Sequence, residues 1–155
     1  MKTLMSTLLV IAAASNMAVA GDKPDFSGNW KLDTDKSTFG PMPPPSSMTA
    51  KIKHTEPDLV IETVSDGGQG PQTATSKYST DGKETTNSMM GNDVKSKAAW
   101  DGKVLVVNSN MDMGGAQLKM VAKYSLSDDG KTLTQTLNID SPQGAFDLAF
   151  VLVKQ

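Results

Sequence analysis

Apolar and polar residues alternate along short segments of this chain from residue 26 to its C-terminal end. In the segment 26–33, Phe26, Trp30 and Leu32 fall on one side of an extended chain, and the charged residues fall on the other. Beyond residue 20, no stretch repeats its apolar residues at helical spacing over several turns. The pattern therefore predicts an all-β protein.

Turn dipeptides separate the alternating segments, among them Asp81-Gly82, Asp101-Gly102 and Asp129-Gly130, which suit the positive φ angles of tight hairpins. The predicted strands, about ten in number, cover residues 26–33, 48–54, 58–65, 72–79, 83–88, 93–100, 103–110, 116–126, 131–139 and 145–153. Such strands form an antiparallel up-and-down meander, which avoids exposed edges most simply by closing into a barrel. A two-sheet β-sandwich is the alternative.

One connection, residues 34–47 with the sequence TDKSTFGPMPPPSS, is much longer than the others. Its prolines exclude a regular helix, and its apolar Phe39, Pro41 and Met42 predict a flap that lies on the protein body. Such a flap would cap the mouth of a barrel and control access to it.

The first twenty residues, MKTLMSTLLVIAAASNMAVA, have the features of a secretory signal peptide: one lysine, an apolar run from Leu8 to Ala14, and Ala18-Val19-Ala20 before the expected cleavage site. We expect residues 21–155 to form a single domain that is secreted or periplasmic. The chain has no cysteine, so it carries neither disulfides nor a lipidated cysteine. No apolar run approaches the roughly 20 residues of a membrane span.

The formal net charge is only −2, and it is spread along the chain, so neither nucleic acid nor an anionic membrane is an expected partner. Every cationic side chain is a lysine, because the sequence contains no arginine. Bidentate capture of a carboxylate by a guanidinium group is therefore excluded. We expect a monomer without a metal or other cofactor.

Gly28 falls on the buried side of the first segment, where its missing side chain leaves room beside Trp30. This Gly-x-Trp in FSGNWKL, together with WDGKVLVV, resembles the calycin superfamily, and particularly the fatty-acid-binding proteins within it. The whole pattern, with DKSTFGPMPPPSS and YSLSDDGKTLTQTL, is similar to small exported bacterial lipocalin-like proteins. The resemblance implies a barrel that holds a small hydrophobic or amphipathic ligand.

Two features depart from that family. The proline-rich flap stands where fatty-acid-binding proteins have a helical lid, and no arginine is present to bind a ligand carboxylate or to cover the first-strand tryptophan. Lys154 is the expected substitute over Trp30, through a cation–π contact.

Small and flexible residues on the inward faces predict a cavity inside the barrel. The ligand-binding candidates are Trp100, Met120, Tyr124, Tyr78, His54, Ala98 and Ala122. Asp147 interrupts an apolar strand, but the alternation there is consistent with an outward position.

We expect no enzymatic activity, because His54 is the only histidine and no pair of carboxylates is placed for acid–base catalysis. Two alternatives to a ligand-binding barrel remain. One is an accessory module whose outer face binds another exported protein or a surface polymer. The other is copper binding, with His54 and the thioethers of Met111 and Met113 as ligands.

Overall fold

The computed structural model describes residues 22–155, so the signal peptide expected at residues 1–20 lies outside the described residues. Ten strands and one short 3-10 helix, η1, make up this part of the chain. They are β1 Gly28–Leu32, η1 Thr34–Lys36, β2 Ser47–Thr55, β3 Asp58–Asp66, β4 Pro71–Ser79, β5 Asp81–Met89, β6 Asn92–Asp101, β7 Val104–Asp112, β8 Gln117–Leu126, β9 Thr132–Ser141 and β10 Gly144–Lys154. All ten strands were predicted, with bounds that differ by no more than two residues.

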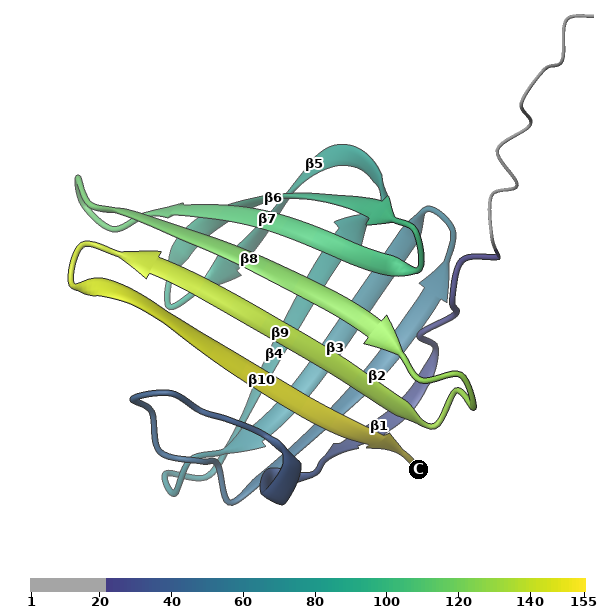
Figure 1. Cartoon of the computed structure of the whole chain (residues 1–155). Coiled ribbons are helices and arrows are strands. Elements are labelled where there is room, and N and C mark those ends of the chain that lie inside the picture. The colour runs from purple at the N-terminus through teal and green to yellow at the C-terminus, as the bar shows by residue number, and fades with distance from the viewer. Residues whose placement is uncertain (1–21) are drawn as a thin grey trace, which may run out of the picture.

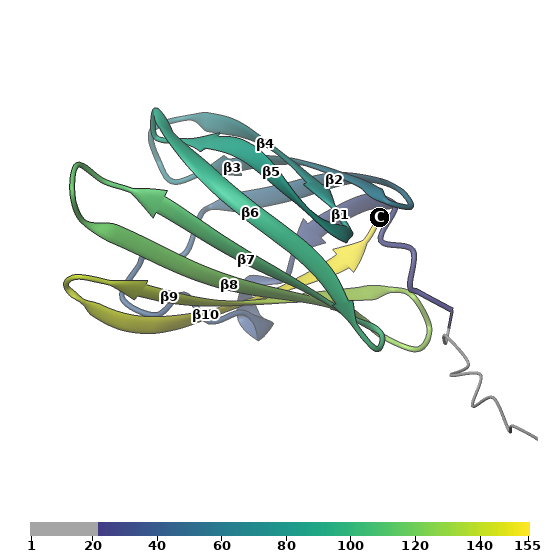
Figure 2. The ribbon, with the colours of Figure 1, turned by 90° about the horizontal axis from the view of Figure 1, so that it is seen from above.

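The strands form one antiparallel sheet in the order β4-β3-β2-β1-β10-β9-β8-β7-β6-β5. Pairing of β1 with β10, where Trp30 stands opposite Lys154, joins the two halves of the meander. The edge strands β4 and β5 lie next to each other, and the sheet curls into a nearly closed barrel (Figures 1 and 2). The barrel predicted from the sequence is confirmed, and the two-sheet sandwich was the wrong alternative.

Because the strands alternate in direction, the connections gather at two ends of the barrel. The turns after β2, β4, β6 and β8 lie at the end where the C-terminus is found, on the right of Figure 1. We call this the closed end, because Phe26 and Trp30 fill it and are each only 1% exposed. The turns after β3, β5, β7 and β9 lie at the opposite end, which we call the open end.

Gly28 in β1 makes room for a lysine side chain. Its φ of +137° favours glycine, and a Cβ atom added there would lie 2.9 Å from Cε of Lys154. The Lys154 ammonium stands 5.4 Å from the centre of the Trp30 ring, which confirms the expected cation–π contact. The space beside Trp30 is therefore occupied by Lys154, and the indole Nε1–H donates a 2.9 Å hydrogen bond to the carbonyl of Phe26.

The segment 34–47 lies against β10. Backbone hydrogen bonds join Thr38 to Ala149 in both directions, and the ring of Phe39 packs 5.8 Å from that of Phe150. Pro41 and Met42 are exposed, so Phe39 is the residue that anchors the segment to the barrel. The only helical turn in this segment is η1, which precedes the prolines.

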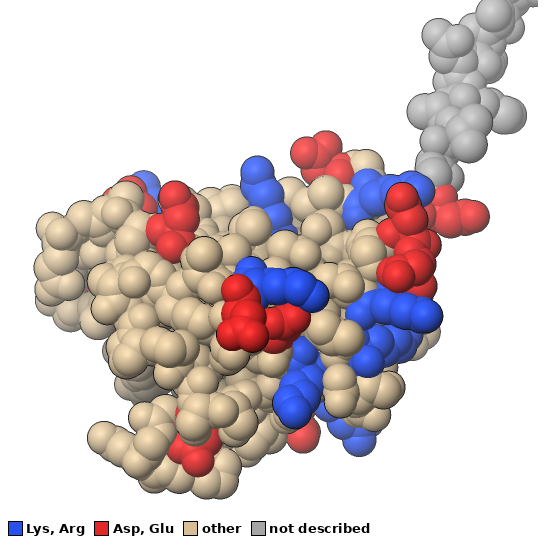
Figure 3. Space-filling view, turned by 60° about the horizontal axis from the view of Figure 1, so that its bottom comes forward, with Lys and Arg blue, Asp and Glu red and all other residues tan. Residues whose placement is uncertain are grey.

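Buried residues form two apolar clusters. The larger cluster runs from the closed end to the wall on which Phe39 packs, and the smaller one, Val94, Met111 and Met120, lies toward the open end. Lysine and acidic side chains are interspersed on the face seen in Figure 3. None of the helices within residues 22–155 has the length and apolar character needed to cross a bilayer.

Candidate functional site

An interior cavity of about 220 Å³ lies between the two apolar clusters, walled by strands β4 to β9. Its apolar lining comes from Ala74, Met89, Val94, Met120, Ala122 and Leu137. Its polar lining comes from Ser76, Tyr78, Asn87, Ser88, Ser109, Tyr124 and Gln135. The wall thus combines apolar side chains with uncharged polar groups, and polar groups that converge on an apolar cavity can fix the orientation of a small molecule.

The largest polar group in the cavity is formed by two tyrosines and a glutamine. The Gln135 Nε2–H donates a 3.0 Å hydrogen bond to the Tyr124 hydroxyl. Burial raises the pKa of Tyr124 well above its ordinary value, and the neighbouring Tyr78 adds to this rise. Burial also raises the pKa of Tyr78, although hydrogen bonds with Ser76 and Tyr124 partly offset it. Both hydroxyls therefore stay neutral at physiological pH.

A side-chain bridge spans the two edge strands of the sheet beside this cavity. Oδ1 of Asn87 on β5 accepts a 2.7 Å hydrogen bond from the backbone N–H of Lys77 on β4. The Asn87 Nδ2–H donates a 3.0 Å hydrogen bond back to the Lys77 carbonyl. The asparagine amide thus replaces the main-chain pairing that β4 and β5 lack in the sheet order.

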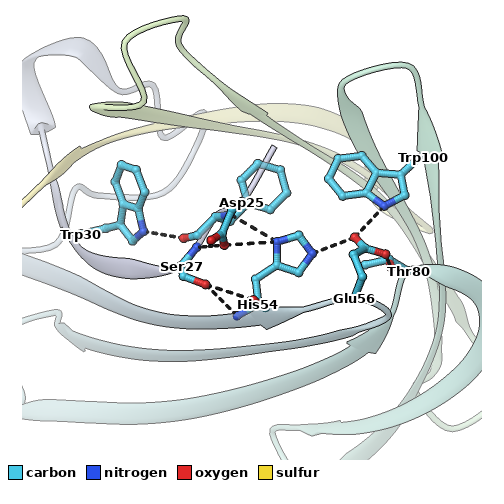
Figure 4. Close-up of polar contacts among 8 residues, drawn as sticks. Asp25, Ser27, Trp30, His54, Glu56, Thr80 and Trp100 are labelled. Carbon is cyan, nitrogen blue, oxygen red and sulfur yellow. Dashed lines mark hydrogen bonds and ion pairs between the residues drawn. The ribbon is translucent and has the colours of Figure 1, made fainter. Parts of the chain in front are cut away.

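At the closed end, a separate polar cluster surrounds His54 (Figure 4). The Phe26 backbone N–H points to Nδ1 of His54 at 3.2 Å, and a backbone amide can only donate. Nδ1 is therefore the acceptor, and the Nε2–H group donates a 2.8 Å hydrogen bond to Oε1 of Glu56. The His54 side chain is only 3% exposed, and its ring stacks on those of Phe26 and Trp100.

Glu56 is the acceptor that holds this cluster together. It receives hydrogen bonds from the Thr80 hydroxyl, His54 and the Trp100 indole N–H, the last at 3.0 Å. Burial alone would raise the pKa of Glu56, but these three hydrogen bonds keep it below its ordinary value. A shallow depression on the surface of the closed end is lined by His54 and Glu56 together with Lys23 and Asp25.

The structure divides the candidate ligand-binding residues into two groups. Tyr78, Met120, Ala122 and Tyr124 line the cavity. Trp100 and His54 belong to the closed-end cluster, and Ala98 is packed in the core. The predicted lining therefore combines two regions that the fold separates.

Several lining residues were not among the candidates. Ser76 alternates with Lys77 on β4, while Gln135 and Leu137 alternate with Thr136 on β9. The same alternation that identified Tyr124 would have identified these three residues. No residue of the segment 34–47 lines the cavity, because that segment packs on β10 at a different wall.

The proposed copper ligands do not converge. His54 lies in the closed-end cluster, whereas Met113 follows β7 at the open end. Leu105 marks the closed-end side of β7 and comes eight residues before Met113. At a strand rise of about 3.3 Å per residue, Met113 therefore lies about 25 Å from the closed end. Within residues 22–155, no group of three or more histidine and acidic side chains is arranged to hold a metal.

A wider groove of about 510 Å³ lies on the outer surface, between Thr38 and strands β8 to β10. Its lining includes Lys123, Asn138 and Asp147, and Asn138 donates a 2.7 Å hydrogen bond to the Asp147 carboxylate. Asp147 is exposed, as the alternation in β10 suggested.

No family model matches the chain, and no curated protein matches it. Solved structures with the same fold, however, match this chain. Zebrafish ileal bile acid-binding protein, complexed with cholic acid, has a TM-score of 0.60 at 16% identity, over 84% of this chain and 98% of its own. Lipid binding protein 8 of Caenorhabditis elegans has a TM-score of 0.61 at 12% identity, over 84% of this chain and 95% of its own.

A third similar structure is a secretory abundant heat soluble protein of Ramazzottius varieornatus. It has a TM-score of 0.59 at 12% identity, over 83% of this chain and 94% of its own. At these identities the three comparisons show a shared fold, the ten-stranded barrel of the calycin type.

Proposed function

We propose that this protein binds a small hydrophobic or amphipathic molecule inside its barrel after export from the cell. The observation that carries the proposal is the interior cavity, whose lining combines apolar side chains with uncharged hydrogen-bonding groups. Two proteins of the same fold are named for binding bile acid and lipid, which supports a hydrophobic ligand.

The cavity limits the size of the ligand. Its volume of about 220 Å³ is below the roughly 300–1,000 Å³ that ligand pockets commonly measure. A short chain or a single ring fits. A longer molecule would extend between β4 and β5, where the barrel wall has only the Asn87 bridge.

Native mass spectrometry of the protein exported from a bacterial host tests the proposal. We expect a monomer with an added mass that organic solvent removes, and a polypeptide that begins at Gly21 once the signal peptide is cleaved. Metal analysis of the same sample tests copper. A polypeptide that stays empty after incubation with a lipid extract would contradict the proposal. It would favour an accessory module that acts through the outer face of the barrel.

A further inference from the structure

Three of the polar side chains that line the cavity, those of Tyr78, Tyr124 and Gln135, lie at its inner end, toward the closed end of the barrel. Tyr124 stands opposite Leu105 near the β6–β7 turn, and Gln135 stands opposite Tyr124. Tyr78 stands opposite Leu59 near the β2–β3 turn, on the other wall. A ligand head group placed here would meet two hydroxyls and one amide, all of them neutral.

The apolar part of the lining lies toward the open end. Val94 stands opposite Met111 and Met120 opposite Ser109, so both are farther along their strands than Tyr124. Met89 is the last residue of β5, next to the open-end turn. The inner end of the cavity is thus formed by the two tyrosines and Gln135, whereas its outer part combines these apolar side chains with Asn87, Ser88 and Ser109.

None of the described residues that line the cavity carries a charge. The lysines of the same strands occupy the alternate positions, and Lys77, Lys119 and Lys123 are exposed on the outside of the barrel. The chain has no arginine at any position. A carboxylate head group would be desolvated there without a cationic partner, which costs several kcal/mol or forces protonation.

We infer that the cavity selects an uncharged amphiphile with a hydroxyl head group, held by Tyr78, Tyr124 and Gln135, and rejects the anion of a fatty acid of the same length. The inference rests on the proposed function, because it names the ligand class of the same cavity. A hydroxyl both donates and accepts, so it can join the hydrogen bonds of the tyrosine hydroxyls and the Gln135 amide without a change of charge.

Calorimetric titration with matched probes tests the inference. The probes are hexanol, octanol and decanol, each paired with the carboxylate of the same length, at neutral pH. We expect each alcohol to bind about tenfold or more tightly than its carboxylate, a difference of about 1.4 kcal/mol per factor of ten. Acidification should narrow the difference in affinity between each alcohol and its carboxylate, because the protonated acid is neutral.

A charge placed inside the cavity should reverse this preference. Gln135→Lys provides a cation beside Tyr124, so we expect octanoate to bind about tenfold or more tightly than it does to the wild-type protein. Thr136→Lys is the matched control, because Thr136 is the next residue of β9 and is exposed on the outer face. It adds the same charge but should leave octanoate binding unchanged.

The outcomes separate the inference from the proposed function. Tighter binding of the alcohols, with a gain for octanoate only in Gln135→Lys, supports both. Equal or tighter binding of the carboxylates to the wild-type protein overturns the inference, while the ligand-binding function stands. Absence of binding by every probe, in the wild-type protein and in Gln135→Lys alike, overturns the proposed function and the inference with it.

Discussion

At the scale of single residues, the first strand shows how one missing side chain positions two others. Gly28 leaves the volume that the Lys154 side chain occupies, and Lys154 in turn covers the face of Trp30. Trp30 then closes the barrel end through its hydrogen bond to the Phe26 carbonyl. The glycine is therefore required by a contact that involves the last strand, β10.

Replacing Gly28 with alanine should destabilise the protein by roughly 1–3 kcal/mol, because φ at this position is +137° and the new Cβ would displace Lys154. The measurement is the urea concentration at the unfolding midpoint. Gly67→Ala is the control, since a Cβ at Gly67 meets nothing within 4 Å and should leave the midpoint nearly unchanged. Equal midpoints for the two variants would show that Gly28 has no structural role.

Glu56 acts at the same scale, through charge. Its folded-state pKa is depressed, so the ionised form stabilises the folded protein above the ordinary pKa of 4.5. This contribution is lost as the pH falls through the lower folded-state pKa, because the unfolded chain takes up the proton more readily. The closed-end cluster should therefore weaken in acid.

The variant Glu56→Gln should lower the stability at neutral pH by roughly 1 kcal/mol, a value discounted because the carboxylate is 38% exposed. The difference from the wild-type protein should shrink in acid, where Glu56 is protonated as well. Urea unfolding at neutral and acidic pH measures both quantities, and Glu84→Gln, an exposed side chain on β5, provides the control. A difference that does not vary with pH would contradict the role of the charge.

At the scale of the elements, the contact between β4 and β5 is the weakest part of the barrel wall. Other neighbouring strands are joined by main-chain ladders, whereas Asn87 and Lys77 join these two through a side-chain amide. The cavity lies directly behind this contact, since Ser76, Tyr78 and Asn87 belong to its lining. Opening of the two edge strands would therefore expose the cavity.

Replacing Asn87 with alanine removes both hydrogen bonds across β4 and β5. We expect faster amide hydrogen exchange at Lys77, faster exchange of bound octanol, and a loss of stability of roughly 1–2 kcal/mol. Asn138→Ala is the matched control, because Asn138 bonds only the exposed Asp147 on the outer face. Unchanged exchange at Lys77 in Asn87→Ala would show that the bridge does not hold the gap closed.

At the scale of the whole molecule, the question is how the interior volume is divided between core and cavity. Ala98 and Ala122 are both buried, at 1% and 7% exposure, and both face inward from the same curved sheet. Both belong to the larger apolar cluster and stand at the same depth on either side of Val107, but only Ala122 lines the cavity. Exposure alone does not distinguish them, but the surrounding volume does.

This division predicts different effects of one substitution at the two positions. Ala98→Leu should destabilise the protein by roughly 1–3 kcal/mol through overpacking and leave octanol binding intact. Ala122→Leu should fill part of the cavity, abolish octanol binding and cost under about 1 kcal/mol. Urea unfolding and calorimetry on both variants provide the test. Overpacking of similar size at both positions would mean that the interior is packed throughout.

The ten strands, their turns and the barrel could be predicted from the amino-acid sequence, because side-chain alternation and Asp-Gly turns are local properties of the chain. The sequence also identified Trp30 and Lys154 as partners, and the inward positions of Tyr78, Met120, Ala122 and Tyr124. Each of these follows from which face of a strand a residue occupies.

The position of the cavity along the barrel, and the set of inward residues that line it, depend on how distant segments pack together. His54 and Trp100 face inward as predicted but belong to the closed-end cluster, because Phe26 folds into the closed end and stacks on both of them. Ala98 stands at the same depth as Ala122 but lies outside the cavity lining. The Asn87 bridge likewise depends on how β4 and β5 meet. Alternation sets the face of each residue, whereas curvature and the packing of distant segments set the depth and the neighbours.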